Sequence, residues 1–137
     1  MLGEKISEEH GKISRMRMLP GDDYRYLKNE VSFQTSSKIF GVDYTDMGTY
    51  QVFERVPSQL FGEGQGIIFT SEGESAIWRA HGVGHMTGKG MAMSFRFSCA
   101  FQAGPTGKLA RLNKVLVIGE HEVDAEGNAH SILWEWK

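Results

Sequence analysis

The stretch Gly62–Thr70, "GEGQGIIFT", decides the fold that the sequence predicts. Its alternate glycines are compatible with a phosphate-binding loop or with a β-strand that bends. A nucleotide-binding loop requires a strand, a glycine-rich turn and then the N-terminus of a helix. Here Gly66 is followed by "IIFT", which favours a strand, and the spacing is GxGxG rather than GxGxxG or GxxxxGK. We therefore predict a bent strand that carries its glycines on one face, and no cofactor.

Alternation of apolar and polar residues recurs along the chain and indicates further strands. The segment 91–104 is the clearest, with an apolar row on one face: Met91, Met93, Phe95, Phe97, Cys99 and Phe101. Similar patterns predict strands within the segments 11–19, 30–40, 48–56, 59–74, 75–90, 114–123 and 129–137. Glycine-containing turns of hairpin length separate several of them, at 71–74, 87–90 and 124–128.

Only residues 105–114 look helical, as one or two turns over about 106–113. Residues 22–27, "DDYRYL", are predicted to form a loop. Successive antiparallel strands are best stabilised by closing the sheet, because closure removes exposed edges. We therefore predict an all-β fold, a closed or strongly curved antiparallel barrel of about eight strands, in a single domain over 13–137. Residues 1–12 are expected to be disordered or loosely attached.

The composition is that of a globular protein, with 137 residues of which 40% are hydrophobic and 23% charged. The net charge of -2 argues against a nucleic-acid or anionic-membrane partner, since both require a concentrated basic surface. The longest apolar runs are too short to cross a bilayer, and "MLGEKISEEHGK" at the start contains no apolar segment typical of a signal peptide. Cys99 is the only cysteine, which suits a reducing compartment. We therefore expect the protein in the cytoplasm.

The face opposite the glycines carries the candidate site. Glu63 and Gln65 lie there in the glycine-rich strand, and Arg79 and His81 lie there in the next strand. If this face lines the barrel, these polar groups sit in an otherwise apolar cavity, where ionisable side chains are costly unless paired and therefore indicate a binding site. If it faces solvent, they are ordinary surface residues. Arg96, on the polar face of the clearest strand, completes the candidate ligand-binding set.

The histidines do not predict a metal site. His81 and His85 are four residues apart, but Gly82 and Gly84 between them favour a strand, in which that separation spans about 13 Å. Zinc–nitrogen bonds of about 2 Å do not bridge this distance. We expect no protein-bound metal. Cys99 lies among phenylalanines, which favours a buried structural role over that of a nucleophile.

The tryptophans are interpreted as structural. Trp78 lies on the glycine side of its strand and is predicted to pack over the flat surface that the glycines leave. Trp134 and Trp136 share a face and are predicted to lie in the core or in a subunit interface. In "GEHEVD" at 119–124, His121 lies on the face opposite the two glutamates, which we interpret as the polar wall of a strand rather than an acid–base pair.

The motifs "GEGQGIIFT" (62–70), "HGVGHMTGKGM" (81–91) and "KLARLNKV" (108–115), in this order and followed by an acidic strand, resemble a family of small bacterial proteins of unknown function. The fold of that family is similar to the calycin-like barrel of plant allene oxide cyclase, and the resemblance extends from about Val31 to the C-terminus. It implies a closed antiparallel barrel and a homo-oligomer, and it transfers no catalytic residues. The plant enzyme cyclises an unsaturated fatty-acid epoxide in an apolar cavity, chiefly by positioning it.

Three functions are compatible with these observations. The first is a barrel that binds a small apolar or amphipathic molecule, oriented by polar groups such as Glu63, Gln65 and Arg79. The second is an isomerase or cyclase acting on a similar molecule, with Glu63 as a general base and Arg79 or His81 binding an anion. The third is a solid-core structural module that forms oligomers through its aromatic C-terminus. Of the three, the sequence favours ligand binding.

Overall fold

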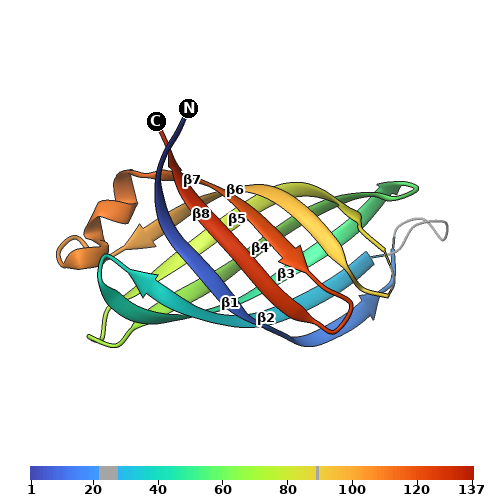
Figure 1. Ribbon diagram of the computed structural model, residues 1–137, viewed down its shortest axis with the longest axis horizontal. Helices are drawn as coiled ribbons and strands as arrows, with labels where there is room; N and C mark the ends of the chain where they lie inside the picture. Colours follow the sequence, from blue (N-terminus) through green and yellow to red (C-terminus); the bar gives the residue numbers. More distant parts are fainter. Residues whose placement is uncertain (22–27, 89) are drawn as a thin grey trace.

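A computed structural model describes residues 1–21, 28–88 and 90–137 of the chain (Figure 1). The predicted loop at 22–27 lies outside the described residues, as does position 89 of the turn predicted at 87–90. The strands are β1 (Leu2–Leu19), β2 (Lys28–Ile39), β3 (Val42–Val56), β4 (Gln59–Thr70), β5 (Ser75–Met86), β6 (Met93–Ala103), β7 (Leu116–Val123) and β8 (Asn128–Trp136). A short 3₁₀ helix, η1 (Lys108–Lys114), lies between β6 and β7.

The eight strands form a closed antiparallel barrel in which each strand pairs with its neighbours in the sequence and β1 pairs with β8. The predicted closed barrel is therefore confirmed. The two chain ends lie side by side because the Cα partners of the closing pair run from Leu2–Trp136 to Lys12–Asn128 (Figure 1). Residues 1–12 were expected to be loosely attached, but most of them belong to β1 and pair with β8. This pairing closes the barrel, and without it two sheet edges would be exposed.

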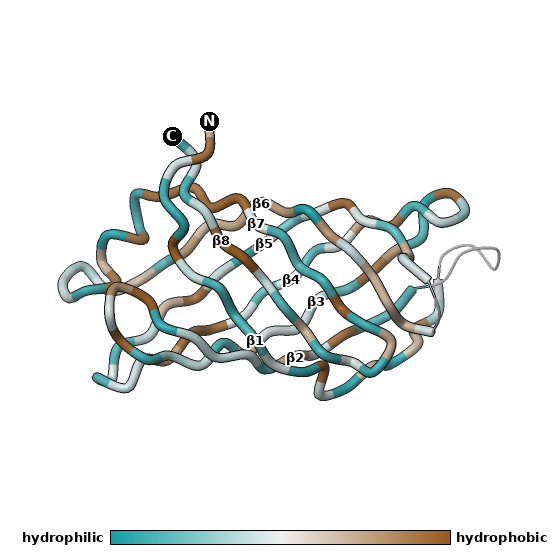
Figure 2. The backbone as a smooth tube through the Cα atoms, viewed as in Figure 1, coloured by the Kyte–Doolittle hydropathy of each residue, from teal (hydrophilic) through white to brown (hydrophobic). Residues whose placement is uncertain are grey.

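Apolar and polar residues alternate along the strands (Figure 2), and the barrel interior takes one set from each. In β4 the inward face contains buried Leu60 and Ile68, and the glycines at 62, 64 and 66 lie on that same face. The glycine face is thus the lining of the lumen, which is the interior of the barrel. The bent-strand interpretation of this stretch agrees with the structure, since the glycines lie within a continuous strand and precede no helix.

The glycines on the lumen face accommodate aromatic side chains that lie flat against the barrel wall. A Cβ atom added at Gly48 or Gly66 would approach Trp78 Cζ2 to 2.4 Å. Phe95 similarly covers Gly84, where an added Cβ would come within 2.7 Å of its ring. The prediction that Trp78 packs over the surface left by the glycines agrees with this arrangement. Small residues on the wall and large rings in the lumen are complementary in volume.

The 3₁₀ helix η1 covers one end of the barrel, where the helical turn at 106–113 was expected (Figure 1). Leu109 and Leu112 are buried and belong to the main apolar cluster together with Ile39 and Ile68. These leucines exclude water from that end of the lumen. Among the described residues, no helix has the length and apolar character needed to span a membrane.

A second strand segment, besides the first half of β1, lies outside the sequence-based expectation. Residues 42–47 continue β3 toward a tight hairpin with β2, whose two connecting residues, Phe40 and Gly41, both have positive φ angles of 50° and 80°. Such a turn matches the right-handed twist of the flanking strands, but phenylalanine is rare at a positive φ. The turn therefore has no strong sequence signal, and for this reason the sequence did not predict the part of β3 before residue 48.

Replacing Gly66 by alanine tests the packing of the lumen. The added Cβ would lie 2.4 Å from Trp78 Cζ2 and 2.5 Å from the main-chain oxygen of Met47, which cannot move without breaking the ladder. We expect Gly66→Ala to lower the free energy of unfolding by about 2–4 kcal/mol, measured by urea denaturation. Gly104→Ala is the control, because its Cβ would meet only an atom at 3.9 Å. Equal stability of the two variants would contradict the proposed packing.

Candidate functional site

The lumen contains a cavity of about 80 Å³ in the middle of the barrel. Its apolar lining is mainly aromatic and consists of Phe33, Trp78, Phe95, Phe97, Phe101 and Leu133. Its polar lining consists of Glu9, Asp46, Tyr50, His121 and Ser131. The wall segments around Gly62–Gly64 and Ala80–Gly82 also border the cavity. Because these wall residues lack large inward side chains, the cavity lies where the lumen is least filled.

Two carboxyl groups meet on one side of the cavity. Glu9 on β1 accepts hydrogen bonds from the hydroxyls of Thr35, at 2.9 Å, and Tyr44, at 2.6 Å. Asp46 on β3 is hydrogen-bonded to Glu9 and accepts the indole N–H of Trp78 at 2.7 Å. Glu9 and Asp46 are both buried. Their strands are not adjacent but both pair with β2, whose Thr35 lies between the two carboxyl groups, so the consecutive pairing of β1, β2 and β3 assembles the pair.

Burial raises the pKa of Asp46 well above its ordinary value, and the neighbouring Glu9 raises it further. The Trp78 hydrogen bond acts in the opposite direction and is the weaker influence. Two buried carboxylates side by side repel each other strongly, so a shared proton is the stable arrangement. The raised pKa of Asp46 favours the protonated carboxyl, which can donate a hydrogen bond.

A neutral imidazole lies on another side of the same cavity. The Nδ1 atom of His121 is 2.8 Å from Ser131 Oγ, and its Nε2 atom is 3.0 Å from the hydroxyl oxygen of Tyr50. Burial lowers the pKa of His121 to about 4, with a smaller opposing effect from Glu122. The same burial raises the pKa of the Tyr50 hydroxyl. Both groups are therefore uncharged at neutral pH and offer only hydrogen bonds.

Cys99 also lines the cavity. Burial raises the pKa of its thiol, and the neighbouring Asp46–Glu9 carboxyl pair raises it further. Nucleophilic cysteines require the thiolate form, which an electropositive environment favours. The environment of Cys99 favours the neutral thiol instead, in keeping with the structural role inferred from its position among phenylalanines.

The structure places the predicted residues of β4 and β5 on the outside of the barrel. Gln65 and Arg79 are exposed cross-strand neighbours, as are Glu63 and His81, whose side chains are 48% and 64% exposed. The side chains of Glu63 and His81 approach each other to 3.9 Å in solvent, although their positions in the wall border the cavity. The lumen orientation considered for this face is therefore wrong, because the glycine face was needed to accommodate the lumen rings. A role of these residues in ligand binding stays a prediction.

Arg96 also lies on the outer wall, away from the lumen. Its guanidinium group forms ion pairs with Glu120 at 3.2 Å and Glu122 at 2.9 Å on the neighbouring β7. With its side chain 55% exposed, this network contributes little to stability. The structure thus brings Arg96 together with β7 rather than with the other four predicted residues.

Three residues of the lumen site were missed by sequence reasoning. Glu9 lies in the segment expected to be loose, and Asp46 lies in the part of β3 that had no turn signal before it. His121 was placed on the face opposite Glu120 and Glu122 but interpreted as part of a polar wall. Its face also contains Val117, Gly119 and Val123, and this apolar alternation was the available signal that it points inward.

The fold and this lining define the class of the protein: a small closed antiparallel β-barrel with a mainly aromatic lumen and buried polar groups. Similar structures include a protein of unknown function from Clostridium acetobutylicum, with 10% identity, a TM-score of 0.80 and 98% coverage of both chains. A conserved protein of unknown function from Rhodopseudomonas palustris has 12% identity and a TM-score of 0.78 over 99% of both chains. A β-barrel-like protein from Acinetobacter baumannii has 10% identity and a TM-score of 0.81, covering 100% of this chain and 96% of its own.

These likenesses are to uncharacterised bacterial β-barrel proteins, and at such low identity they concern the fold alone. No protein-family model matches the sequence, and no curated protein matches it. The comparisons accordingly show a small β-barrel fold and no function. Any function has to be argued from the residues in and on its barrel.

The lowered pKa of His121 predicts an acid-sensitive barrel. Between about 4 and 6.5 the unfolded chain binds more protons at this residue than the folded chain, so stability falls as the pH drops through that window. We expect His121→Gln to remove about 2–3 kcal/mol of the stability difference between pH 7 and 4.5, measured by urea denaturation. Asp46 acts in the opposite direction because its pKa is raised, and Asp46→Asn should therefore steepen the loss of stability on acidification. An unchanged pH profile in His121→Gln would contradict a neutral buried imidazole.

Proposed function

We propose that the barrel is a binding protein that holds a small, mostly apolar molecule with one hydrogen-bonding group in the lumen cavity. The observation that carries the proposal is the composition of the cavity wall, which is mainly aromatic and carries two separate polar groups, the Glu9–Asp46 pair and His121 with its partners Tyr50 and Ser131. Buried polar groups destabilise a core unless they are needed, and ligand pockets combine apolar walls with a few polar groups that fix orientation.

The size of the cavity limits the ligand. One water molecule requires about 10–15 Å³ of such space, so 80 Å³ accommodates several waters or a molecule of about one six-membered ring. A long acyl chain would require the lumen rings to move, and their contact with the glycines opposes this. The proposed ligand therefore has a single ring or a short chain. Its polar group would replace one of the present hydrogen bonds, taking the place of Glu9 at Asp46 or of Tyr50 or Ser131 at His121.

An isomerase or cyclase is the second candidate, supported by the opposite pKa shifts of the two polar groups. Burial keeps Asp46 protonated and His121 unprotonated, so one wall of the cavity holds an acid and another holds a base. Paired groups with pKa values moved apart are typical of acid–base catalysis. A lumen of this kind would act on a small molecule of the size and polarity given above. We propose a cytoplasmic location for either function, in keeping with one buried free cysteine.

Phenol is a suitable probe of the lumen, because it combines one ring with one hydroxyl. We expect tag-free protein to bind phenol with a Kd on the order of 0.1–1 mM, followed through the fluorescence of Trp78 in a Trp134→Phe, Trp136→Phe background. Asp46→Asn removes the acid while keeping the shape of the side chain and should weaken binding by about tenfold. Benzene should bind with little dependence on Asp46, since it has no polar group.

The control is Asp43→Asn, which changes an exposed carboxylate of the same strand that pairs with Lys38 at 2.8 Å. This variant should bind phenol as the unsubstituted protein does. Absence of a fluorescence change with phenol and with benzene would instead support the solid-core structural module. Binding that is equally weakened in Asp43→Asn would place the probe outside the lumen.

We also propose that the chain forms a homo-oligomer through the outer surface near its two ends. Leu2, Leu116 and Trp136 are neighbours across β1, β8 and β7, and each is about half exposed. Contiguous apolar surface of this kind is typical of subunit contacts. Light scattering coupled to gel filtration should show an oligomer that Trp136→Glu dissociates. Met47→Glu, on an exposed position of β3, should leave the mass unchanged.

A further inference from the structure

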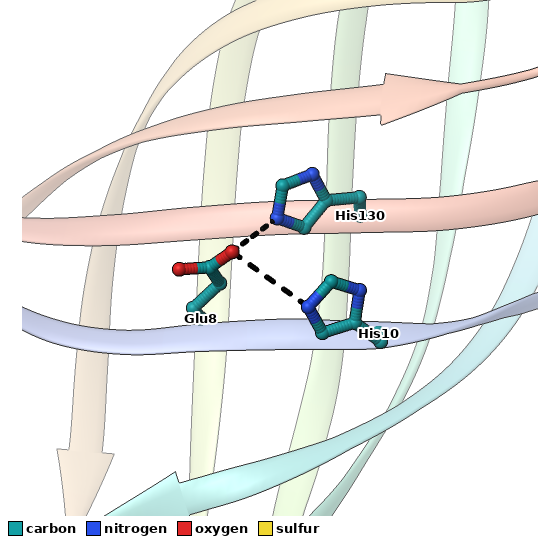
Figure 3. A group of neighbouring side chains, drawn as sticks. All are labelled: Glu8, His10 and His130. Atoms are coloured by element: carbon teal, nitrogen blue, oxygen red, sulfur yellow. Dashed lines mark hydrogen bonds and ion pairs between the residues drawn. The ribbon is translucent and has the colours of Figure 1, made fainter.

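We propose that Glu8, His10 and His130 form a zinc-binding site on the outer wall, where β1 and β8 close the barrel (Figure 3). The site is separate from the lumen and independent of the function proposed for it. One candidate ligand atom from each of these residues lies within 4.8 Å of the other two. An imidazole pair with a carboxylate is a ligand set that zinc uses in proteins.

The two imidazoles are directed at one point. The Nε2 atom of His130 is 2.7 Å from Glu8 Oε2, and the Nε2 atom of His10 is 3.7 Å from the same oxygen. The two rings are stacked, with centroids 4.5 Å apart and an angle of 9° between their planes. Figure 3 shows one nitrogen of each ring facing the Glu8 carboxylate, with His10 on β1 and His130 on the neighbouring β8. The three ligand atoms are therefore already gathered on one side of the rings.

The backbone register produces this convergence. His10 and His130 are direct cross-strand partners in the β1–β8 ladder, which places their Cβ atoms about 5 Å apart. Glu8 precedes His10 by two residues and therefore lies on the same outer face. The ladder continues from Ser7 to Lys12 without a register shift, so this part of the closing pair is regular. A rigid sheet thus presents all three side chains, and little backbone order has to be gained on binding.

The geometry requires only side-chain adjustment to hold the ion. Zinc–ligand bonds of about 2.0–2.2 Å place ligand atoms roughly 3–3.5 Å apart in a tetrahedral site. The Nε2 atom of His10, 3.7 Å from Glu8 Oε2, lies only slightly beyond this spacing, and its side chain is 69% exposed, so a small adjustment meets no packed neighbour on the solvent side. Lys5, now 3.1 Å from Glu8 Oε1, pairs with the other carboxylate oxygen and does not occupy the shared one. Three protein ligands leave the fourth position open to water or to a small anion.

This proposal differs from the expectation of no protein-bound metal. That expectation considered His81 and His85, which lie four residues apart on a single strand, and the separation argument still applies to them. The proposed site takes one histidine from each end of the chain. Their meeting depends on β1–β8 pairing, which the sequence does not display.

Zinc binding is tested by calorimetry on tag-free protein that has been dialysed against a chelator. Titration with zinc chloride in a non-coordinating buffer should show one ion per chain. His10→Ala, His130→Ala and Glu8→Gln should each weaken binding by about tenfold or more, since loss of even an outer-shell partner costs 10–100-fold. Cobalt(II) titrated alone should give the visible absorption of a tetrahedral site in the unsubstituted protein and lose it in the variants.

The matched control is His85→Ala, which removes an exposed histidine from the outer wall of β5. It should leave the zinc stoichiometry and affinity unchanged. All variants are at solvent-accessible positions, and far-UV circular dichroism checks their folding. If His130→Ala fails to fold, His10→Ala is compared with His85→Ala instead, because His10 is highly exposed. The proposal is overturned if zinc does not saturate at one ion per chain, or if His10→Ala binds as tightly as His85→Ala.

Discussion

The packing of lumen rings against wall glycines is the constraint on which the rest of this structure depends. An eight-stranded barrel has an interior only just wide enough for the side chains that point into it. Trp78 lies over Gly48 and Gly66, and Phe97 lies against Gly82 and Gly119, at distances that leave no room for a Cβ atom. This complementarity determines which face of each strand points inward. It also leaves the small cavity beside the segments with the least side-chain volume.

The chemistry of the lumen follows from the same packing. Trp78 connects the packing to the chemistry, because its ring lies on the glycines while its indole N–H donates a hydrogen bond to Asp46. Exclusion of water disfavours charge, which raises the pKa of the Asp46 carboxyl and lowers that of the His121 imidazole. One physical cause therefore produces a neutral acid and a neutral base in one cavity. Their hydrogen bonds to Trp78, Tyr50 and Ser131 keep them satisfied in the absence of a ligand.

The alternation of β1 separates two sites with different chemistry. Glu9 points inward to the carboxyl pair, while Glu8 and His10 on either side of it point outward to His130. The inner site is buried and mainly apolar, and suits a small organic molecule. The outer site is hydrated and holds a carboxylate between imidazoles, and suits a cation. The two sites share a strand but no side chain, so one can be altered without the other.

Local pattern was sufficient for the strands, the glycine turns, the helical turn before β7 and the closed antiparallel barrel, because a period of two and turn residues are properties of neighbouring positions. The placement of Trp78 over the glycines also followed, since both lie on one face of adjacent strands. The local pattern did not predict which face lines the lumen, because Glu63 and His81 alternate with glycines as regularly as inward-facing residues do. Only the closed structure decided it, by requiring space for the rings. Only closure, too, brings His10 to His130, while Glu9 meets Asp46 because β1 and β3 both pair with β2; both contacts join residues that are far apart in the chain.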